Sequence, residues 1–559
     1  MPAVSLSPIF NGWQGFTVNG IPLNGGLINT YLAASSTPAL TYTDNTGGTS
    51  NANPIVLNAS GYPPSEIWLV QGTAYKFVLT DSLGLNTQTF DNISSGPSFT
   101  DLSASSGSSL IGFIQAGSGA VARTLQSKDR EIVSITDFGA VGDGATDNSA
   151  AITTAIAAIP STGGALFVPA GTFKFSSTIS LKPNLMLFGK GTASVLSYTG
   201  AGVAVQAVGA LPVTAQYEGV IRDLRITTAT GTHGLRLKDL VSFEVGSIRI
   251  DGFSTTGLHL TGTAITGLCI VISIHNSWFV LNTGSGILAD SVNAINQVSI
   301  TNNRIEGNSG IGINIGAAGA GWNISGNDIE GNAGSTELMI DGGNCSGVSV
   351  SGNYFESAAA HPCIIVANTQ EQRGISITGN IIQNDLATTN AIVLGVSQYV
   401  KGVVVQGNSF SGLATNGISI FAVNGGVFGP NWTQGSIVQA NLVNSSSTGI
   451  KIFNTDNRIA PTYGVSITIN PSLADEFDIT ATNNTAFTIA NPTQGSDDRV
   501  ILITVRNTSG GGLGAVTWDT LYKLAAWTSP ANGFSRSISY RFNGTNWVEV
   551  SRTTVDVPN

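Results

Sequence analysis

Carboxylate side chains recur at one place in three successive repeats of this sequence. Glu306, Glu330 and Glu356 each lie three residues after an asparagine, in the pattern Asn-x-apolar-Glu. Asp328 lies two residues before Glu330. Paired carboxylates can serve as general acid and base, or as acid and nucleophile, in the hydrolysis of glycosidic bonds. These four residues are therefore the candidate catalytic residues.

This chemistry requires the repeats to place the carboxylates side by side. Neighbouring strands of a sheet lie ~4.8 Å apart. At that separation two carboxylates repel by ~3.5 kcal/mol at an effective dielectric constant of ~20, which favours a proton on one of them. Adjacent repeats approach the ~5–5.5 Å carboxyl separation of retaining glycosidases, and alternate repeats, such as those of Glu306 and Glu356, approach the ~6.5–9.5 Å of inverting ones.

Three nearby side chains are candidates for substrate binding. Trp322 and Tyr354 offer rings on which sugars could stack, and Arg304 places a cation beside the carboxylates. Arg304 also supports a second interpretation, in which the patch is a solvated, ion-paired face and the catalytic residues lie elsewhere. In that case Asp290 and Asp341 are the alternative carboxylates.

The elements that position these residues form a repeat. Asparagines in a predicted tight turn recur every 24 to 33 residues, at Asn276, Asn303, Asn327, Asn353, Asn380, Asn408 and Asn441. Stacked turns would join these side chains into a hydrogen-bonded ladder. Apolar residues such as Ile300 and Ile305 flank the turn on the inward side, and a third strand follows each pair. A repeat of about 25 residues built this way predicts a parallel β-helix. The same alignment puts Phe279 in the outward column of Glu306 and Ser277 in that of Arg304.

Composition agrees with strands joined by turns, and it excludes several partners. Charged residues make up 10% of the 559 residues, with 69 glycines and a net charge of −10. This acidity argues against nucleic acid and anionic membranes as partners. We find no signal peptide and no stretch of ~18 apolar residues, so we expect synthesis in the cytoplasm and no membrane insertion. The three cysteines and four histidines lack metal-type spacing, so no metal or other cofactor is expected.

Four segments follow one another along the chain. We predict a small β-domain over residues 1–98, a neck over 99–131 with a helix-like stretch at 120–128, the β-helix over 132–454, and a β-sandwich over 455–559. A helix beginning after Asp147 carries Ile152, Ala155, Ile156 and Ile159 at helical spacing. It is expected to cover the open end of the β-helix, which otherwise exposes strand edges.

Several motifs resemble a known superfamily. Residues 137–144 and 163–173 resemble the entry of the pectate-lyase-like right-handed parallel β-helix superfamily. Residues 117–136 resemble the joint before that entry in bacteriophage tailspikes. Residues 8–10, 25–31 and 53–61 resemble the virion-binding domain of short-tailed phage tailspikes. The resemblance covers about the first 450 residues.

The resemblance implies an all-β homotrimer with a single-stranded right-handed parallel β-helix. Residues 1–98 would bind the phage tail or portal proteins, which places the protein in the virion tail. The β-helix would attach the virion to host surface polysaccharide, O-antigen or capsule, and depolymerise it as an endoglycosidase with paired carboxylates. Two alternatives stay open: a polysaccharide lyase on the same fold, and a receptor-binding adhesin without catalysis. The C-terminal segment would serve trimerisation or sugar binding.

Overall fold

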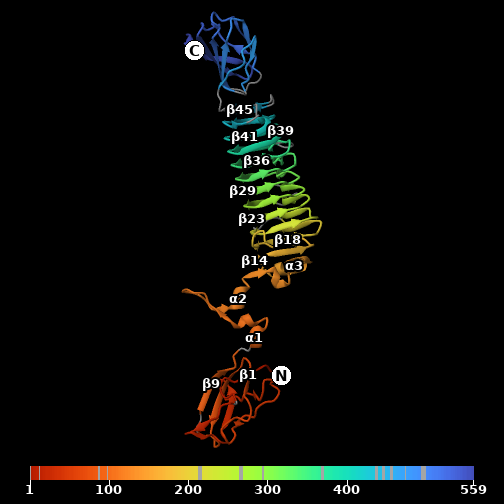
Figure 1. The fold of residues 1–559 in the computed structure, drawn as a ribbon, viewed down its shortest axis with the longest axis vertical. Coiled ribbons are helices and arrows are strands. Elements are labelled where there is room, and N and C mark those ends of the chain that lie inside the picture. Colours follow the sequence, from red (N-terminus) through yellow and green to blue (C-terminus); the bar gives the residue numbers. More distant parts are fainter. Residues whose placement is uncertain are drawn as a thin grey trace. The chain divides into compact units, whose positions relative to one another are not determined.

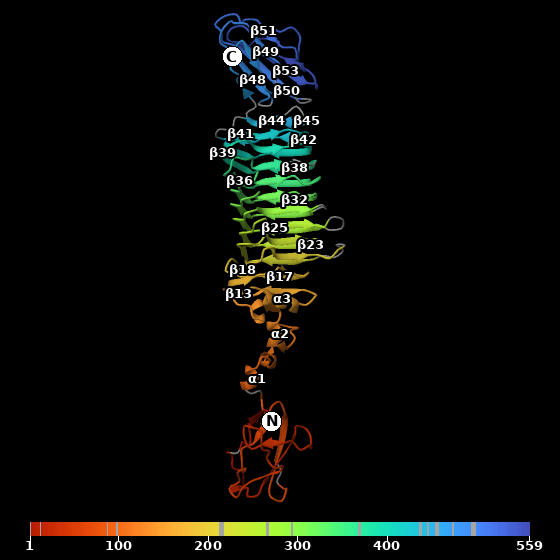
Figure 2. The same cartoon turned by 90° about the vertical axis from the view of Figure 1, so that its right-hand side faces the viewer.

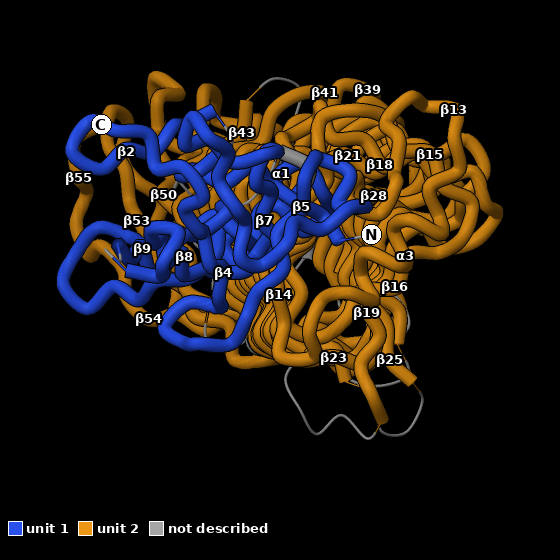
Figure 3. The backbone as a smooth tube through the Cα atoms, turned by 90° about the horizontal axis from the view of Figure 1, so that it is seen from below, with its two compact units in different colours: residues 1–131 blue, residues 132–559 orange. Residues whose placement is uncertain are grey.

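The structure, a computed structural model, forms two compact units, residues 1–131 and residues 132–559 (Figure 3). It describes the whole chain except residues 1, 12, 86–87, 97–98, 212–216, 264–267, 292–294, 367–370, 435–438, 444–446, 453–457, 472–473 and 493–498. Strands dominate both units (Figure 1). Within the described residues, no helix is both long enough and apolar enough to cross a membrane.

The first unit begins with a small all-β domain, as its short alternating runs predicted. Its sheets contain three strands (β1 Val4–Leu6, β7 Trp68–Val70, β5 Thr41–Tyr42), four strands (β6 Ile55–Val56, β4 Leu27–Leu32, β8 Ala74–Thr80, β9 Gln88–Ser94) and a hairpin (β2 Thr17–Val18, β3 Ile21–Pro22). All pairings are antiparallel, and the inward faces pack around Phe10 and Phe77, whose rings stack at 5.5 Å.

The neck contains short elements: α1 (Phe99–Ser103), η1 (Gly107–Leu110), β10 (Gly112–Phe113), β11 (Arg123–Thr124) and α2 (Leu125–Asp129). The helix predicted over 120–128 therefore begins later than expected. Arg123 and Thr124 pair instead with β10, and the Thr124 side chain caps α2 by accepting a hydrogen bond from the Ser127 amide. The hydroxyl of Thr124 thus fixes the start of the helix.

The second unit contains the predicted parallel β-helix, built from three parallel sheets (Figures 1 and 2). Sheet 1 has thirteen strands: β12 (Ile132–Ser134), β14 (Gly164–Phe167), β17 (Leu185–Phe188), β20 (Gly219–Arg222), β23 (Leu240–Gly246), β26 (Cys269–His275), β29 (Ile295–Thr301), β32 (Ala320–Ser325), β35 (Ser346–Ser351), β38 (Gln372–Thr378), β40 (Val400–Gln406), β42 (Val423–Phe428) and β45 (Thr448–Ile452).

Sheets 2 and 3 follow sheet 1 in each coil and share the long strands β39 (Ile381–Leu394) and β41 (Ser409–Ile420). Sheet 2 otherwise consists of β13 (Asp143–Asp147), β15 (Gly171–Phe175), β18 (Ser194–Tyr198), β21 (Arg225–Thr228), β24 (Arg249–Asp251), β27 (Trp278–Val280), β30 (Arg304–Glu306), β33 (Asp328–Glu330), β36 (Tyr354–Ser357) and β43 (Trp432–Thr433). Sheet 3 otherwise consists of β16 (Ile179–Ser180), β19 (Val203–Val208), β22 (His233–Lys238), β25 (Thr256–Gly262), β28 (Ser285–Ser291), β31 (Ile313–Ile315), β34 (Leu338–Ile340), β37 (Ile364–Val366) and β44 (Gln439–Val443).

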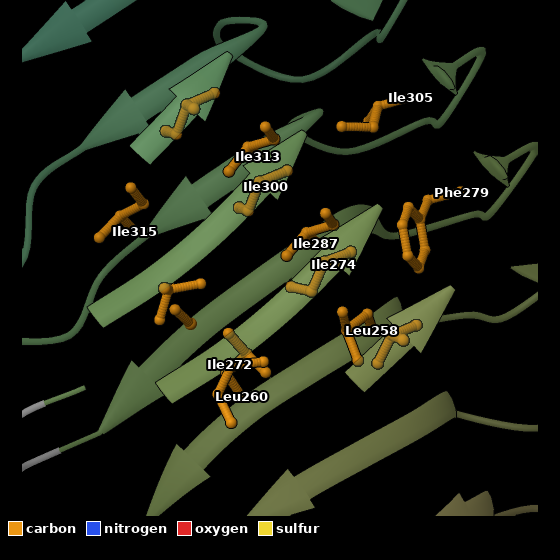
Figure 4. Close-up of a cluster of buried hydrophobic side chains, with 14 of the residues drawn as sticks. Leu258, Leu260, Ile272, Ile274, Phe279, Ile287, Ile300, Ile305, Ile313 and Ile315 are labelled. Carbon is orange, nitrogen blue, oxygen red and sulfur yellow. The ribbon is translucent and has the colours of Figure 1, made fainter. Parts of the chain in front are cut away.

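One continuous apolar core fills the β-helix. Each sheet contributes a stacked column of inward residues, such as Ile274 and Ile300 from sheet 1, Ile305 from sheet 2 and Ile313 from sheet 3 (Figure 4). All four are fully buried. The predicted inward orientation of Ile300 and Ile305 is confirmed, and the alternate residues of each strand therefore point to solvent.

An asparagine ladder runs through the turns between sheets 1 and 2. From Asn327 onwards, Oδ1 of each ladder asparagine accepts from the amide N–H and from Nδ2 of the asparagine one coil earlier, at 2.9–3.0 Å. The members are Asn303, Asn327, Asn353, Asn380, Asn408 and Asn431. Two predicted members were wrong: Ser277 occupies the place expected for Asn276, and Asn441 lies in β44, where it pairs with Ile418.

A helix packs against the first coil. Helix α3 spans Ser149–Ala158, and its Ile152, Ala155 and Ile156 belong to the same buried cluster as Leu166 of sheet 1. The cap position predicted at Asp147 was one residue too early: Asn148 precedes the helix, and Asp147 before it accepts a hydrogen bond from the Ser149 amide at 2.9 Å. The helix therefore buries apolar side chains that the first coil would otherwise expose.

The last part of the chain forms two sheets around a separate core that includes Ile503, Tyr540 and Trp547. The sheets are β46 (Arg458–Ile459), β48 (Glu476–Ala481), β50 (Val500–Asn507), β53 (Phe534–Phe542), β54 (Trp547–Arg552), β52 (Tyr522–Lys523) and β55 (Val557–Pro558), facing β47 (Ser466–Thr468), β49 (Phe487–Ala490) and β51 (Val516–Trp518). The two-layer architecture agrees with the predicted sandwich, although many neighbours are parallel. Successive strands here alternate between the two sheets and pair in parallel, as successive strands of a solenoid do.

Candidate active site

The four predicted carboxylates lie together on the outer face of sheet 2. Backbone pairing places Glu306 beside Glu330 and Glu330 beside Glu356 on three successive rungs. Asp328 lies on the middle rung, two residues from Glu330. All four side chains are half-buried, and the residues that alternate with them along the strands point into the core. The sequence alignment therefore gave the correct register over these three coils.

Arg304 binds three of these carboxylates at once. Its Nε lies 2.7 Å from Glu306 Oε2 and 3.8 Å from Asp328 Oδ2, and its Nη2 donates a hydrogen bond to Glu330 Oε1 at 3.4 Å. One cation therefore faces three anions. The ion pairing that the sequence offered as an alternative to catalysis is present, but it leaves an excess of negative charge on the patch.

Asp328 experiences that excess most directly. Burial raises the pKa of its carboxyl, and the charges of Glu330 and Glu306 raise it further, while Arg304 lowers it. Its Oδ1 is buried and has no hydrogen-bond partner among the described residues. Asp328 therefore binds a proton more readily than an ordinary aspartate.

Glu356 has different neighbours from the other two glutamates. The Tyr354 hydroxyl donates a short hydrogen bond to Glu356 Oε2. This bond lowers the pKa of Glu356, but burial and the nearby carboxyl of Asp385 raise it more, so that the net direction is upward. The pKa of Glu356 therefore lies above its usual value. Sequence reasoning missed Asp385, because it lies two residues beyond the aligned column in the extended strand β39.

A fifth carboxyl lies buried behind the patch. Glu337 is fully buried and accepts hydrogen bonds from the amide of Asn332 at 3.3 Å and from its Nδ2 at 2.5 Å. It ends a second ladder of Asn282, Asn308 and Asn332, in the position where a further asparagine oxygen would accept. Burial, with the charges of Glu330 and Glu356, raises the pKa of Glu337 to about 8 despite these bonds.

In the coil before the patch the sequence alignment was wrong by one residue, and a tryptophan is the outward residue there. Trp278, not Ser277, pairs with Arg304, and Phe279 is fully buried against the core, not outward beside Glu306. The Trp278 side chain is 43% exposed. Arg304 Cζ lies 5.9 Å from the centre of its ring. An exposed ring next to the carboxylates is a platform on which a sugar can stack.

The prediction that Trp322 stacks on substrate was wrong. Trp322 points inward from β32, retains 1% exposure and donates from Nε1 to the carbonyl of Ile295 at 3.1 Å. It shares the inward face with Ile324, two residues later, because side chains alternate along a strand. Tyr354, the other predicted ring, does lie on the outer face beside Glu356.

The alternative carboxylates lie away from the patch. Asp290 belongs to sheet 3, where its Oδ1 lies 2.5 Å from His259 Nε2, and His259 stacks on His233. Burial and the neighbouring imidazole lower the pKa of His233 to about 4. Asp341 follows β34 of the same sheet. Among the described residues, no group of three or more His, Cys, Asp or Glu side chains is arranged to hold a metal ion.

Parts of the chain are similar in sequence to known proteins. Residues 132–363 match the family model of rhamnogalacturonase A/epimerase, pectate lyase-like. A tail spike protein of Shigella phage Sf6 is 33% identical over 169 residues, which are 26% of this chain. The chain thus spans only 27% of the length of this curated relative.

Solved structures similar to this one include ORF18 of Geobacillus virus E2, at 14% identity and a TM-score of 0.44 over 80% of this chain and 83% of that one. They also include the A-module of the mannuronan C-5 epimerase AlgE6 of Azotobacter vinelandii, at 17% identity and a TM-score of 0.42 over 57% of this chain and 99% of that one.

Proposed function

Since the β-helix of this chain is pectate lyase-like and the chain is a relative of a phage tail spike protein, we propose that it is a tailspike that binds and cleaves host surface polysaccharide. The observation that carries the enzymatic part is the pair Glu330 and Glu356 on adjacent rungs. One member is held by a cation, and the other is held towards its acid form.

We assign the general acid to Glu356. Its raised pKa retains the proton that the departing glycosidic oxygen requires, and Asp385 and Tyr354 form its immediate surroundings. Glu330 supplies the opposing carboxylate. Arg304 stabilises the negative charge of Glu330 and orients it, at 3.4 Å from Nη2 to Oε1.

Adjacent rungs favour a retaining reaction, because strands of one sheet lie ~4.8 Å apart and retaining glycosidases separate their carboxyls by ~5–5.5 Å. In the first step Glu330 bonds to the anomeric carbon while the bond to the glycosidic oxygen breaks and that oxygen takes the Glu356 proton. In the second step water replaces Glu330 and returns its proton to Glu356. Glu306 and Asp328 then tune charge around Arg304 rather than reacting.

The test is incubation of the purified chain with a panel of bacterial O-antigens and capsular polysaccharides. We expect shorter polymers with new reducing ends. A product that absorbs in the ultraviolet through an unsaturated uronate would identify a lyase instead. Binding to a polysaccharide without any change in its length would identify an adhesin, and would refute the enzymatic proposal.

The tailspike proposal includes two statements about assembly. Residues 1–98 attach the protein to the phage tail or portal proteins, and three chains associate in the virion tail. Light scattering on the full chain is expected to give three times the mass of one chain. A stable monomer in solution would contradict the trimer, and removal of residues 1–98 is expected to abolish incorporation into virions while preserving polysaccharide binding.

A further inference from the structure

The coils that precede the acidic patch present a different surface. Trp278 lies between two arginines on the outer column of sheet 2, paired with Arg249 on one side and Arg304 on the other. Their Cζ atoms lie 5.7 Å and 5.9 Å from the centre of the indole ring. The Arg249 side chain is 25% exposed, so both the ring and its cation can reach a ligand.

The charge of this surface is positive. Arg225 and Arg249 share one carboxylate, that of Asp251, at 2.6 Å from Arg225 Nη2 and 3.0 Å from Arg249 Nε. Two cations against one anion leave an excess of one positive charge. Among the hydrogen bonds between described residues, Arg249 uses only Nε, so that its Nη groups remain for a ligand.

The charge reverses across Trp278. On the next rungs Arg304 faces Glu306, Asp328 and Glu330, and one cation against three anions leaves an excess of two negative charges. The same row of outward side chains is therefore cationic before Trp278 and anionic after it. A ligand lying along the row meets both signs within a few rungs of ~4.8 Å each.

We propose that Trp278 and Arg249 form a subsite for a sugar bearing a carboxylate, which rests on the proposed polysaccharide-binding function. The exposed part of the indole packs against the sugar ring, and the Nη groups of Arg249 bind the carboxylate in a charge-assisted pair. Asp328 and Glu330 repel such a sugar, so a neutral sugar occupies the rungs where cleavage is proposed. The substrate is therefore a polysaccharide that contains both acidic and neutral sugars, with a neutral sugar at the cleavage site.

The rung count sets the spacing of this subsite. Trp278 pairs with Arg304, and Arg304 pairs with Asp328, so the ring lies two rungs, or ~10 Å, from the rung of Glu330. This separation places the acidic sugar near the scissile bond without contact between its carboxylate and the catalytic pair. Trp278 and Arg249 are thus specificity-determining residues, and they take no part in the bond-breaking steps.

The experiment measures binding and does not depend on cleavage. Its probes are the tetrasaccharide of alternating glucuronate and N-acetylglucosamine and the same tetrasaccharide with its carboxyl groups reduced to neutral alcohols. Calorimetric titration of the full chain is expected to show the charged form binding about ten-fold more tightly, as a single charge-assisted pair would give. Equal affinities, or no binding of the charged form, overturn the proposal.

Single substitutions test which residues cause the preference for the charged tetrasaccharide. Arg249→Gln is expected to lower the affinity for the charged form to that for the neutral form, and Arg249→Lys to restore part of the difference. Trp278→Ala is expected to weaken both forms. Arg130→Gln, an exposed arginine of the neck, is the matched control and should change neither. A charge preference that persists in Arg249→Gln refutes the subsite, whereas Glu356→Gln tests the catalytic proposal separately, because it should abolish cleavage and leave the preference intact.

Discussion

The amide nitrogen of Ser277 donates a hydrogen bond to Oδ1 of Asn303, 3.0 Å away, one coil further along the β-helix. Its hydroxyl oxygen accepts from the amide of Ile248 at 3.2 Å, and so performs for the previous coil the role that asparagine Oδ1 performs elsewhere. Ser277 is therefore a true member of the ladder. Because it fixes the start of β27, it also determines that Trp278 faces outward.

The ladder is expected to contribute strongly to stability. Asn327→Ala removes the acceptor of the Asn303 amide and of one Nδ2 hydrogen of Asn303, while the other Nδ2 hydrogen keeps its bond to the Ile274 carbonyl, so two buried N–H groups lose their partner. An unsatisfied buried donor costs about 1–3 kcal/mol, so we expect a loss of about 2–5 kcal/mol in the free energy of unfolding, measured by denaturant titration.

The control for this prediction is Asn276→Gly. Asn276 is exposed and outside the ladder, and glycine tolerates its left-handed backbone, at a φ of 51°. We expect a change of less than about 1 kcal/mol for this variant. Similar losses in the two variants would show that the ladder adds no particular stability.

Much of the fold can be predicted from the sequence because the residues that form the core and the asparagine ladder keep the same spacing in each repeat. Ile300 and Ile305 are inward residues on either side of a buried asparagine, and the same spacing recurs coil after coil. Each coil satisfies the same packing and hydrogen-bond requirements, so aligning the repeats recovers their register. Glu306, Glu330 and Glu356 were found for that reason.

The failures have one physical origin. At Asn276 and Ser277 two adjacent residues can both provide the acceptor of the turn, and a shift of one residue exchanges the two faces of a strand. The alignment chose Asn276, which hid Trp278. Asp385 was missed for a related reason, since β39 continues outward past the last aligned residue. The repeat pattern does not show that Trp322 lies in the core of the β-helix, because packing against other coils determines its position.

Glu356→Gln is expected to abolish most of the cleavage activity and to leave polysaccharide binding nearly unchanged. The amide cannot supply a proton to the glycosidic oxygen, and loss of general acid catalysis typically costs about 10²- to 10⁴-fold in rate. Turnover is measured as the release of reducing ends, and binding as retention of the variant on immobilised polysaccharide. Glu371→Gln, which only breaks ion pairs with Arg373 and Lys401, should retain full activity. Full activity in Glu356→Gln would exclude Glu356 as the acid.

Asp385 is expected to set the alkaline limit of activity. Its carboxyl raises the pKa of Glu356, so Asp385→Asn removes a negative charge and lowers that pKa. The acid form of Glu356 is then lost at lower pH, and the alkaline limb of the pH–rate profile should move in the acid direction. The acid limb should stay in place. Asp129→Asn, an exposed residue of α2 with the same change in charge, should leave both limbs unchanged.

Glu337 is expected to make stability depend on pH. Its pKa is about 8 in the folded chain, against an ordinary value of 4.5 in the unfolded chain. Below pH 4.5 the carboxyl is protonated in both states and costs nothing. As the pH rises towards 8, the unfolded chain loses this proton while the folded chain retains it, so stability falls on the order of 1.4 kcal/mol per pH unit.

Glu337→Gln isolates this effect. The amide is neutral at every pH and keeps an oxygen that can accept from Asn332. Thermal unfolding should show that the variant gains stability relative to the wild type between about pH 4 and about pH 9. If the difference in melting temperature between the two proteins is the same at both pH values, Glu337 does not titrate in this range.

Backbone pairing in sheet 2 assigns each outward side chain to a rung, and this has a consequence for how such a surface can change in evolution. Inserting one residue in a coil would exchange its inner and outer faces and destroy the core. Inserting one entire coil between β27 and β30 would preserve the inward and outward faces of every strand and move Trp278 away from Glu330 by ~4.8 Å. The distance between Trp278 and Glu330 can therefore change only in steps of one whole coil, and a lineage can match a longer or shorter sugar repeat only in such steps.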